Sequence, residues 1–332
     1  MAEKVTIATV ARQARVSRQT VSNVINSPHL VRQETRDRVQ AAITALGYRA
    51  NQAARQMRTG RSRLIAVRIE PTRDGINGSV LDRFLHGLTE SAEVAGYRLM
   101  LYTATDDTSE IGAFDDLLAA YDLDAFVLTG TDHGDARTAW LTERDVPFVT
   151  FGRPWDSPER YCWVDVDGAS GTAQATRRLL ATGHRRIGYL GWPAGSGVGD
   201  DRRVGWLTAL REAGIEPPPD LDRQTPDGIE DGEAVARDLL RAADPPTALV
   251  CASDSLALGA LQAVRTLDRA VAVTGFDDTP VARAVGLTSV SQPLPQAAAH
   301  CVRLLTTVLD GSRAATPAHV LLQPSLVLRQ TA

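Results

Sequence analysis

The most constraining feature of this sequence is a regular alternation that begins near residue 64. Short apolar runs alternate with stretches in which apolar residues recur every three or four positions. The runs are typical of buried strands, and the stretches between them are typical of amphipathic helices. The predicted strands are 64–69, 97–102, 125–128 and 146–151, then a second series at 162–166, 186–191, 248–252 and 271–275. The predicted helices are 79–95, 110–120, 137–143, 168–182, 201–213, 232–243 and 255–266.

Strands that alternate with helices form parallel sheets, because a right-handed crossover returns the chain to the same sheet edge. Two such series therefore predict an α/β body of two doubly wound parallel-sheet lobes. Open parallel sheets bind ligands outside the carboxyl ends of their strands. A ligand is expected between the two lobes.

The charge distribution sets the first sixty residues apart from the body. Residues 1–63 hold twelve basic and three acidic residues, whereas the remainder holds 24 basic and 37 acidic residues. A basic segment attached to an acidic chain favours contact with a polyanion such as nucleic acid. The alternative is a solvated basic tail without a partner.

The basic segment has the pattern of three short helices. Thr6 and Ser17 are suitable N-caps, because their hydroxyls can accept a hydrogen bond from a free backbone N–H group. A third helix is expected over 33–46, with Gly47 as its C-terminal stop. Two helices joined by a turn at 14–16, with a third that completes the core, predict a helix-turn-helix. The alternative is a small helical bundle whose polar face contacts only water.

In a helix-turn-helix the second helix enters the major groove by its N-terminal end. Arginine can contact guanine there, glutamine or asparagine can contact adenine, and short polar side chains suit phosphate oxygens. The candidate DNA contacts in this region are Thr6, Ser17, Arg18, Gln19, Thr20, Ser22, Asn23 and Asn26.

Several segments resemble the LacI/GalR family of bacterial transcriptional repressors over nearly the whole chain. They are 5–11, 16–26, 35–39 and 46–55 near the N-terminus, and 147–153, 164–168, 180–188, 252–259 and 274–279 in the body. Arg15 departs from the family, which often has glycine in this turn. The resemblance implies a small all-α helix-turn-helix head at 1–47, a hinge at 48–62 and an effector-binding and dimerisation domain at 63–332, with the fold of periplasmic sugar-binding proteins.

In that fold three chain crossings join the lobes, so the chain after Ser289 should return to the first lobe and the last strand to the second. The expected lobe ranges are 63–161 with 292–319, and 162–291 with 320–332. Residues 51–59 are too few for a stable isolated helix, which predicts folding coupled to DNA binding. The resemblance identifies them as a hinge helix that pairs in the minor groove, where an apolar wedge opens a base step. Its candidate contacts are Asn51, Ala54 and Met57, and the alternative is a plain linker.

Four residues are candidates for effector binding: Arg153, Arg202, Ser253 and Asp277. Arg202 occupies a position that the family uses for an effector-contacting arginine, and a guanidinium suits vicinal hydroxyls or a carboxylate. Asp277 follows a predicted strand and can accept hydrogen bonds from sugar hydroxyls. For each of the four, the alternative is a salt-bridge or helix-cap residue.

Signals for other chemistry are weak. The loop 195–199 lacks the Gly-Lys-Ser/Thr ending of a phosphate loop, the six histidines lack zinc spacing, and no nucleophile–base pair is apparent. Neither a cofactor nor a metal is predicted. Three widely spaced cysteines, a polar N-terminus and no long apolar run favour a cytoplasmic protein away from the membrane.

These observations predict a regulator that binds a palindromic double-stranded DNA operator as a homodimer. A small-molecule effector, expected to be a mono- or oligosaccharide, would control its DNA affinity. A solute-binding protein of a sugar transport system is the competing hypothesis, but such a protein should begin with a signal peptide. An enzyme is third, because no catalytic constellation is present.

Overall fold

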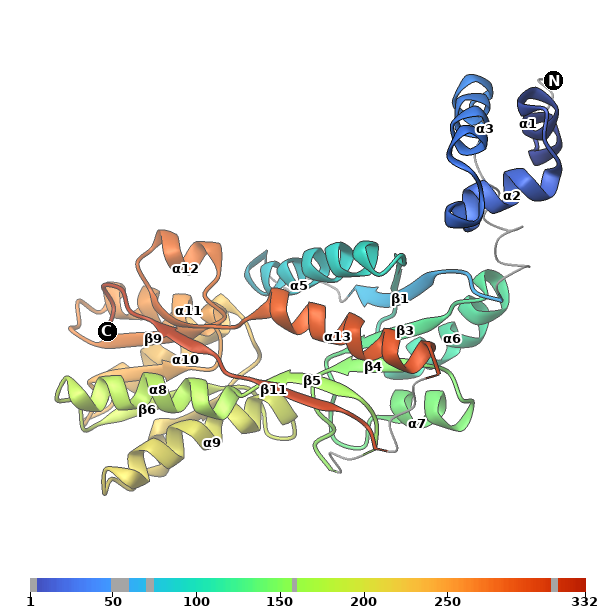
Figure 1. The fold of residues 1–332 in the computed structure, drawn as a ribbon. Helices are drawn as coiled ribbons and strands as arrows, with labels where there is room; N and C mark the ends of the chain where they lie inside the picture. The colour runs from blue at the N-terminus through green and yellow to red at the C-terminus, as the bar shows by residue number, and fades with distance from the viewer. Residues whose placement is uncertain (1–4, 49–59, 70–74, 157–159, 312–315) are drawn as a thin grey trace. The chain divides into compact units, whose positions relative to one another are not determined.

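The computed structural model of the protein describes residues 5–48, 60–69, 75–156, 160–311 and 316–332 (Figure 1). The chain divides into two compact units, Met1–Ser62 and Arg63–Ala332. In the described ranges, no helix has both the length and the apolar character needed to span a bilayer.

The first unit, hereafter the head, is the predicted three-helix domain. It contains α1 (Ile7–Ala14), α2 (Arg18–Asn26), the single 3-10 turn η1 (Pro28–Leu30) and α3 (Gln33–Leu46). Thr6 caps α1 and Ser17 caps α2, each hydroxyl accepting a hydrogen bond from the backbone three residues on. Gly47 ends α3 in the left-handed conformation. A small core holds the helices together: Val10, Ala11, Ala14, Val21, Val24, Val39 and Ala42.

The turn between α1 and α2 places Arg15 in the left-handed region, at φ 51° and ψ 49°. A side chain with a Cβ disfavours this conformation by about 1–2 kcal/mol, whereas glycine adopts it freely but loses more entropy on folding. We expect Arg15→Gly to raise the unfolding free energy of the head by a net amount of about 0.5–1 kcal/mol. Urea denaturation followed by circular dichroism measures this change. A head that is destabilised by the glycine would contradict the strain at this turn.

The second unit, hereafter the body, contains two six-stranded sheets. The first sheet has the order β11-β5-β4-β3-β1-β2, and all its strands are parallel. Its strands are β1 (Leu64–Ile69), β2 (Arg98–Thr103), β3 (Ala125–Thr129), β4 (Phe148–Phe151), β5 (Trp163–Val166) and β11 (His319–Leu322). One core lies under α5 (Gly75–Val94) and α13 (Leu294–Leu309), which pack side by side. Another lies under α6 (Asp107–Tyr121) and α7 (Ala136–Glu143).

The second sheet has the order β12-β10-β9-β8-β6-β7, in which only β12 is antiparallel to its neighbour. Its strands are β6 (Ile187–Gly191), β7 (Asp222–Gln224), β8 (Ala248–Cys251), β9 (Ala272–Phe276), β10 (Thr288–Ser291) and β12 (Ser325–Val327). Its main core includes residues of four helices that pack in two pairs: α8 (Gly168–Ala181) with α9 (Gly197–Glu212), and α10 (Ile229–Arg241) with α11 (Asp254–Thr266). The short elements η2 (Pro219–Leu221) and α12 (Pro280–Ala284) complete this lobe.

The predicted fold class is confirmed, but the lobe limits predicted from the sequence are wrong at two strands. β5 pairs with β4 and with β11, so both β5 and β11 belong to the first sheet. The prediction had placed 162–166 and 320–322 in the second lobe. The alternation of strands and helices in the sequence predicts that a strand is present but not which sheet contains it. In the structure the buried strand β5 lies between β4 and β11. As expected, α13 packs on the first lobe and β12 joins the second sheet.

Helices α8 and α9 approach closely at Gly205. A Cβ atom at this position would lie 2.0 Å from the carbonyl oxygen of Ala169 and 2.3 Å from Oγ1 of Thr172. The nearest obstacle is backbone, so the two helices would have to separate. We expect Gly205→Ala to lower the unfolding free energy of the body by about 1–3 kcal/mol or more, as overpacking of a core does. A Cβ at Gly112 on α6 would meet no atom within 4 Å, so Gly112→Ala is the matched control. Equal denaturation midpoints for the two variants would contradict this close approach.

Candidate functional site

The exposed end of α2 presents the side chains predicted to contact bases. Arg18 and Gln19, in its first turn, are both exposed. Gln19 donates a hydrogen bond from Nε2 to Oδ1 of Asn23, at 3.0 Å. Because Asn23 lies one helical turn along, the two amides are held on one face of α2. These residues combine a cation with two amides that can each form bidentate hydrogen bonds. Such groups are complementary to the base edges that the major groove presents.

The smaller polar residues of the head mainly shape its helices. Thr6 and Ser17 are caps, and the Ser17 hydroxyl also lies 2.8 Å from that of Thr20. Asn26 donates from Nδ2 to the carbonyl oxygen of Ser22 at 2.7 Å. These side chains therefore have structural partners in addition to any phosphate contact. The hinge candidates Asn51, Ala54 and Met57 lie outside the described residues.

In the body, three of the four predicted effector residues, Arg202, Ser253 and Asp277, lie at the carboxyl ends of the second sheet. The order β7-β6-β8-β9-β10 reverses direction between β6 and β8, so this is the topological switch point where doubly wound sheets bind ligands. Arg202 on α9 reaches this point and donates from Nη1 to the carbonyl oxygen of Ala252, just after β8, at 2.5 Å. Trp192 follows β6, and its ring centroid lies 5.1 Å from the Arg202 guanidinium.

Arg202 and Asp277 form a buried ion pair. Arg202 Nη2 lies 3.6 Å from Asp277 Oδ1, and the side chains are 7% and 6% exposed. The guanidinium also lies over the ring of Phe276, 3.7 Å from its centroid. Burial raises the pKa of Asp277, while the charge of Arg202 opposes that rise. Among the described residues, the Nε atom of Arg202 has no hydrogen-bond partner, which leaves one buried donor available to an acceptor.

This cluster includes two further residues that were not predicted from the sequence. Gln292, the first residue after β10, donates from Nε2 to Asp277 Oδ1 at 2.7 Å. Arg83 on α5, in the first lobe, donates from Nη1 to the backbone oxygen of Asp277 at 3.4 Å. Gln292 lies at a strand end, as the predicted residues do, and this position could have identified it from the sequence. Nothing in the sequence links Arg83 to this site.

Ser253 and Arg153 have other partners than the Arg202–Asp277 pair. Ser253 is fully buried, caps α11 and donates from Oγ to Asp227 Oδ1 at 2.5 Å. Its capping role corresponds to the alternative considered for it from the sequence. Arg153, just beyond β4, donates to the carboxylates of Asp165 and Asp201 at 2.8 Å each. Burial raises the pKa of Asp165 to about 6, although the Arg153 charge opposes the rise.

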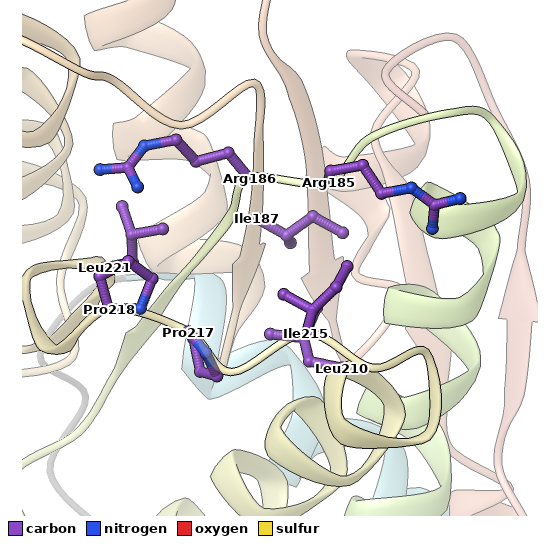
Figure 2. Close-up of a pocket in the computed structure, with 8 residues that line it drawn as sticks. All are labelled: Arg185, Arg186, Ile187, Leu210, Ile215, Pro217, Pro218 and Leu221. Carbon is purple, nitrogen blue, oxygen red and sulfur yellow. The ribbon is translucent and has the colours of Figure 1, made fainter.

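A separate pocket of about 160 Å³ lies in the second lobe and contains none of the predicted site residues (Figure 2). Ile187 belongs to its wall and begins β6, so the pocket lies at the opposite end of that strand from Trp192. Arg186 is already engaged there by Asp220 and Asp244. The pocket is lined by Arg185, Arg186, Ile187, Leu210, Ile215, Pro217, Pro218 and Leu221.

A helix-turn-helix head followed by two lobes with a buried site at the switch point defines a DNA-binding regulator of the ligand-binding type. Residues 6–51 match the family of bacterial regulatory proteins described as lacI family, and residues 176–332 match the periplasmic binding protein-like domain. The transcriptional regulator CelR of Thermobifida fusca is 33% identical, with 98% of each chain covered. GalS of Salmonella typhimurium is 32% identical over 98% of this chain and 96% of its own. This chain belongs to the LacI family of transcriptional regulators, which confirms the resemblance seen in the sequence.

Solved structures agree over the full length. A CelR–cellobiose complex is 31% identical, covers 99% of this chain and 100% of its own, and superimposes with a TM-score of 0.75. A lac repressor dimer bound to operator and an anti-inducer is 26% identical, covers 99% of each chain and has a TM-score of 0.84. The named relatives are transcriptional regulators, not enzymes.

Proposed function

We propose that this protein is a repressor that binds a palindromic operator as a homodimer and whose DNA affinity is set by a small carbohydrate. A two-fold symmetric dimer requires an operator with matching two-fold symmetry. The similarity to a lac repressor dimer on its operator supports this arrangement. Regulation would then depend on binding equilibria alone, and we assign no catalytic step to the protein.

In the head, the proposed readers of base edges are Arg18, Gln19 and Asn23. Arg18 and Gln19 are exposed, Asn23 is half-buried, and none of the three belongs to the head core, which supports this role together with their chemistry. The caps at Thr6 and Ser17, together with Thr20, Ser22 and Asn26, are proposed to fix the helix against the phosphates. In the hinge we propose that Asn51, Ala54 and Met57 contact the minor groove, with Met57 as the apolar wedge.

The observation that carries the effector proposal is the buried Arg202–Asp277 pair at the switch point of the second lobe. The Arg202 guanidinium has a free N–H group that can donate a hydrogen bond to the oxygen of a sugar hydroxyl. The Asp277 carboxylate beside it can accept a hydrogen bond from a hydroxyl proton. Trp192 adds an aromatic side chain to the same cluster. The CelR–cellobiose complex, from a relative of 31% identity, supports a carbohydrate over a nucleobase.

We propose that the effector acts by linkage between the body and the head. A ligand that binds one arrangement of the lobes more tightly shifts the population toward it, and the operator affinity changes by the same coupling free energy. Couplings of this kind are about 1–3 kcal/mol, or roughly 5–150-fold in affinity. Ser253 and Arg153 are assigned no direct effector contact.

A thermal-shift screen of the full chain tests the ligand class. The panel should contain cellobiose, galactose and raffinose as sugars, with adenine and hypoxanthine as nucleobases. We expect a sugar to raise the melting temperature in a concentration-dependent way. A shift by a nucleobase alone would overturn the carbohydrate proposal. A promoter–operator reporter then tests repression: expression should fall when the protein is present, and a rise would identify an activator.

A further inference from the structure

The two lobes touch at the N-terminal end of α9. We infer that Arg153, with Asp165 and Asp201, forms a latch between the lobes that holds this end of α9, and with it Arg202, in place. The inference rests on the proposed function only for the role of Arg202 in effector binding. The latch itself is a property of the body and can be tested without any ligand.

The latch is defined by Arg153, Asp165 and Asp201. Arg153 and Asp165 belong to the first lobe, at the ends of β4 and β5, whereas Asp201 lies on α9 of the second lobe. Arg153 donates from Nε to Asp165 Oδ2 and from Nη2 to Asp201 Oδ2, at 2.8 Å each. One guanidinium therefore joins two lobes with two charge-assisted hydrogen bonds, the stronger class of such bonds.

The three side chains of the latch are largely buried. The side chains of Arg153, Asp165 and Asp201 are 20%, 10% and 17% exposed. Asp201 Oδ2 also accepts a hydrogen bond from the backbone of Ala169 at 3.0 Å, which ties the latch to the start of α8. Without Arg153, two carboxylates would be left largely buried with no cation between them, so the lobes are expected to separate and admit water.

Side-chain packing at the N-terminal end of α9 adds to the ion pairs of the latch. The ring of Trp155, two residues after Arg153, lies against Gly197 at the start of α9. A Cβ on Gly197 would be 2.2 Å from the indole nitrogen. The Arg153 guanidinium lies 4.6 Å from the centroid of the same ring. Only a residue without a side chain fits at Gly197 in this arrangement.

Sequence adjacency connects the latch to the ligand site. Asp201 faces the first lobe and Arg202, the next residue, faces the Asp277 cluster of the second lobe. Separation of the lobes at this contact would pull on the helical turn that carries both Asp201 and Arg202. The latch therefore positions an effector-site residue without being an effector contact, which explains why Arg153 lies apart from that cluster.

Hydrogen exchange of the full chain, read by mass spectrometry, tests this inference without ligand. In Arg153→Met and Asp201→Asn, the peptides covering 153–156 and 194–204 should exchange at least tenfold faster, because both lose the contact between lobes. The double variant should exchange no faster than Arg153→Met, because the hydrogen bond between Arg153 and Asp201 is already absent in that single variant. Gly197→Ala should produce the same pattern by steric exclusion.

Arg177→Met is the matched control. Arg177 pairs with Glu212 between α8 and α9 inside the second lobe, with both side chains about half exposed. It should leave exchange at 153–156 and 194–204 unchanged. Unchanged exchange in Arg153→Met and Asp201→Asn, or additive effects in the double variant, would overturn the latch. Failure of the sugar screen would leave these results intact, so the two proposals are separable.

Discussion

Replacing Arg18 by alanine should abolish most of the preference of the protein for its operator. A bidentate arginine–guanine contact discriminates by about 1–3 kcal/mol, and a symmetric dimer loses two of them. The expected loss is about 2–6 kcal/mol, which is roughly thirtyfold at the least. Arg18 is exposed on α2 and is no part of the head core, so folding should be retained. Fluorescence anisotropy with operator and scrambled duplexes measures the change.

Arg38→Ala is the control for charge. Arg38 is also exposed and lies on α3, not on α2. Arg38 is not among the proposed base readers, so its loss removes only a positive charge and should weaken binding to operator and scrambled duplexes by similar factors. If Arg18→Ala also left the ratio of the two affinities unchanged, Arg18 would not be a base contact.

The largest effect expected in the body is that of Arg202→Ala. The substitution leaves Asp277 buried without its cation, and breaking a buried pair lowers the unfolding free energy by about 3–5 kcal/mol. It also removes the cation of the proposed effector site, so a stabilising sugar should no longer raise the melting temperature. Denaturant unfolding at pH 8 and a thermal-shift titration measure the two consequences.

Arg203→Ala is the matched control on the same helix. Arg203 pairs with Asp222 and its side chain is 36% exposed, so its loss should lower the unfolding free energy by about 1 kcal/mol or less. The response to sugar should remain. Equal losses of unfolding free energy for the two variants would contradict the buried ion pair, and a sugar response retained in Arg202→Ala would remove Arg202 from the effector site.

Much of the head was predictable because its signals are local. Thr6, Ser17 and Gly47 are cap residues whose preferences arise from a few neighbouring backbone groups, and all three were assigned from the sequence. Arg15 was recognised as the unusual residue of the turn, and it does adopt a positive φ. Local chemistry of this kind needs no knowledge of the rest of the fold.

Most strands and helices of the body were predicted from the sequence, but α13, α12 and β10 were not, and not all the pairings were. The three-residue strand β7 is polar and was missed, because a short edge strand has no apolar run to mark it. β5 was found but placed in the wrong lobe, since the choice of sheet depends on partners more than 150 residues away, such as β11. Pairing across such distances is not encoded in any local pattern.

The same limit applies to the site. Arg202 and Asp277 were found because strand ends and family position single them out, and the structure brings them together. Arg153 was grouped with them although it binds Asp165 and Asp201 instead. A sequence position at a strand end predicts which edge of a sheet a residue occupies, but the partner depends on how two lobes meet.

Selection of random duplex DNA by the purified protein, followed by sequencing, tests operator-specific binding most directly. We expect enrichment of a palindrome whose half-sites are related by a dyad, and loss of that enrichment in Arg18→Ala. Footprinting of a duplex carrying the selected sequence should then show two protected half-sites. Binding that enriches no palindrome, with affinity that follows only the salt concentration, would contradict the claim that this protein is an operator-specific regulator.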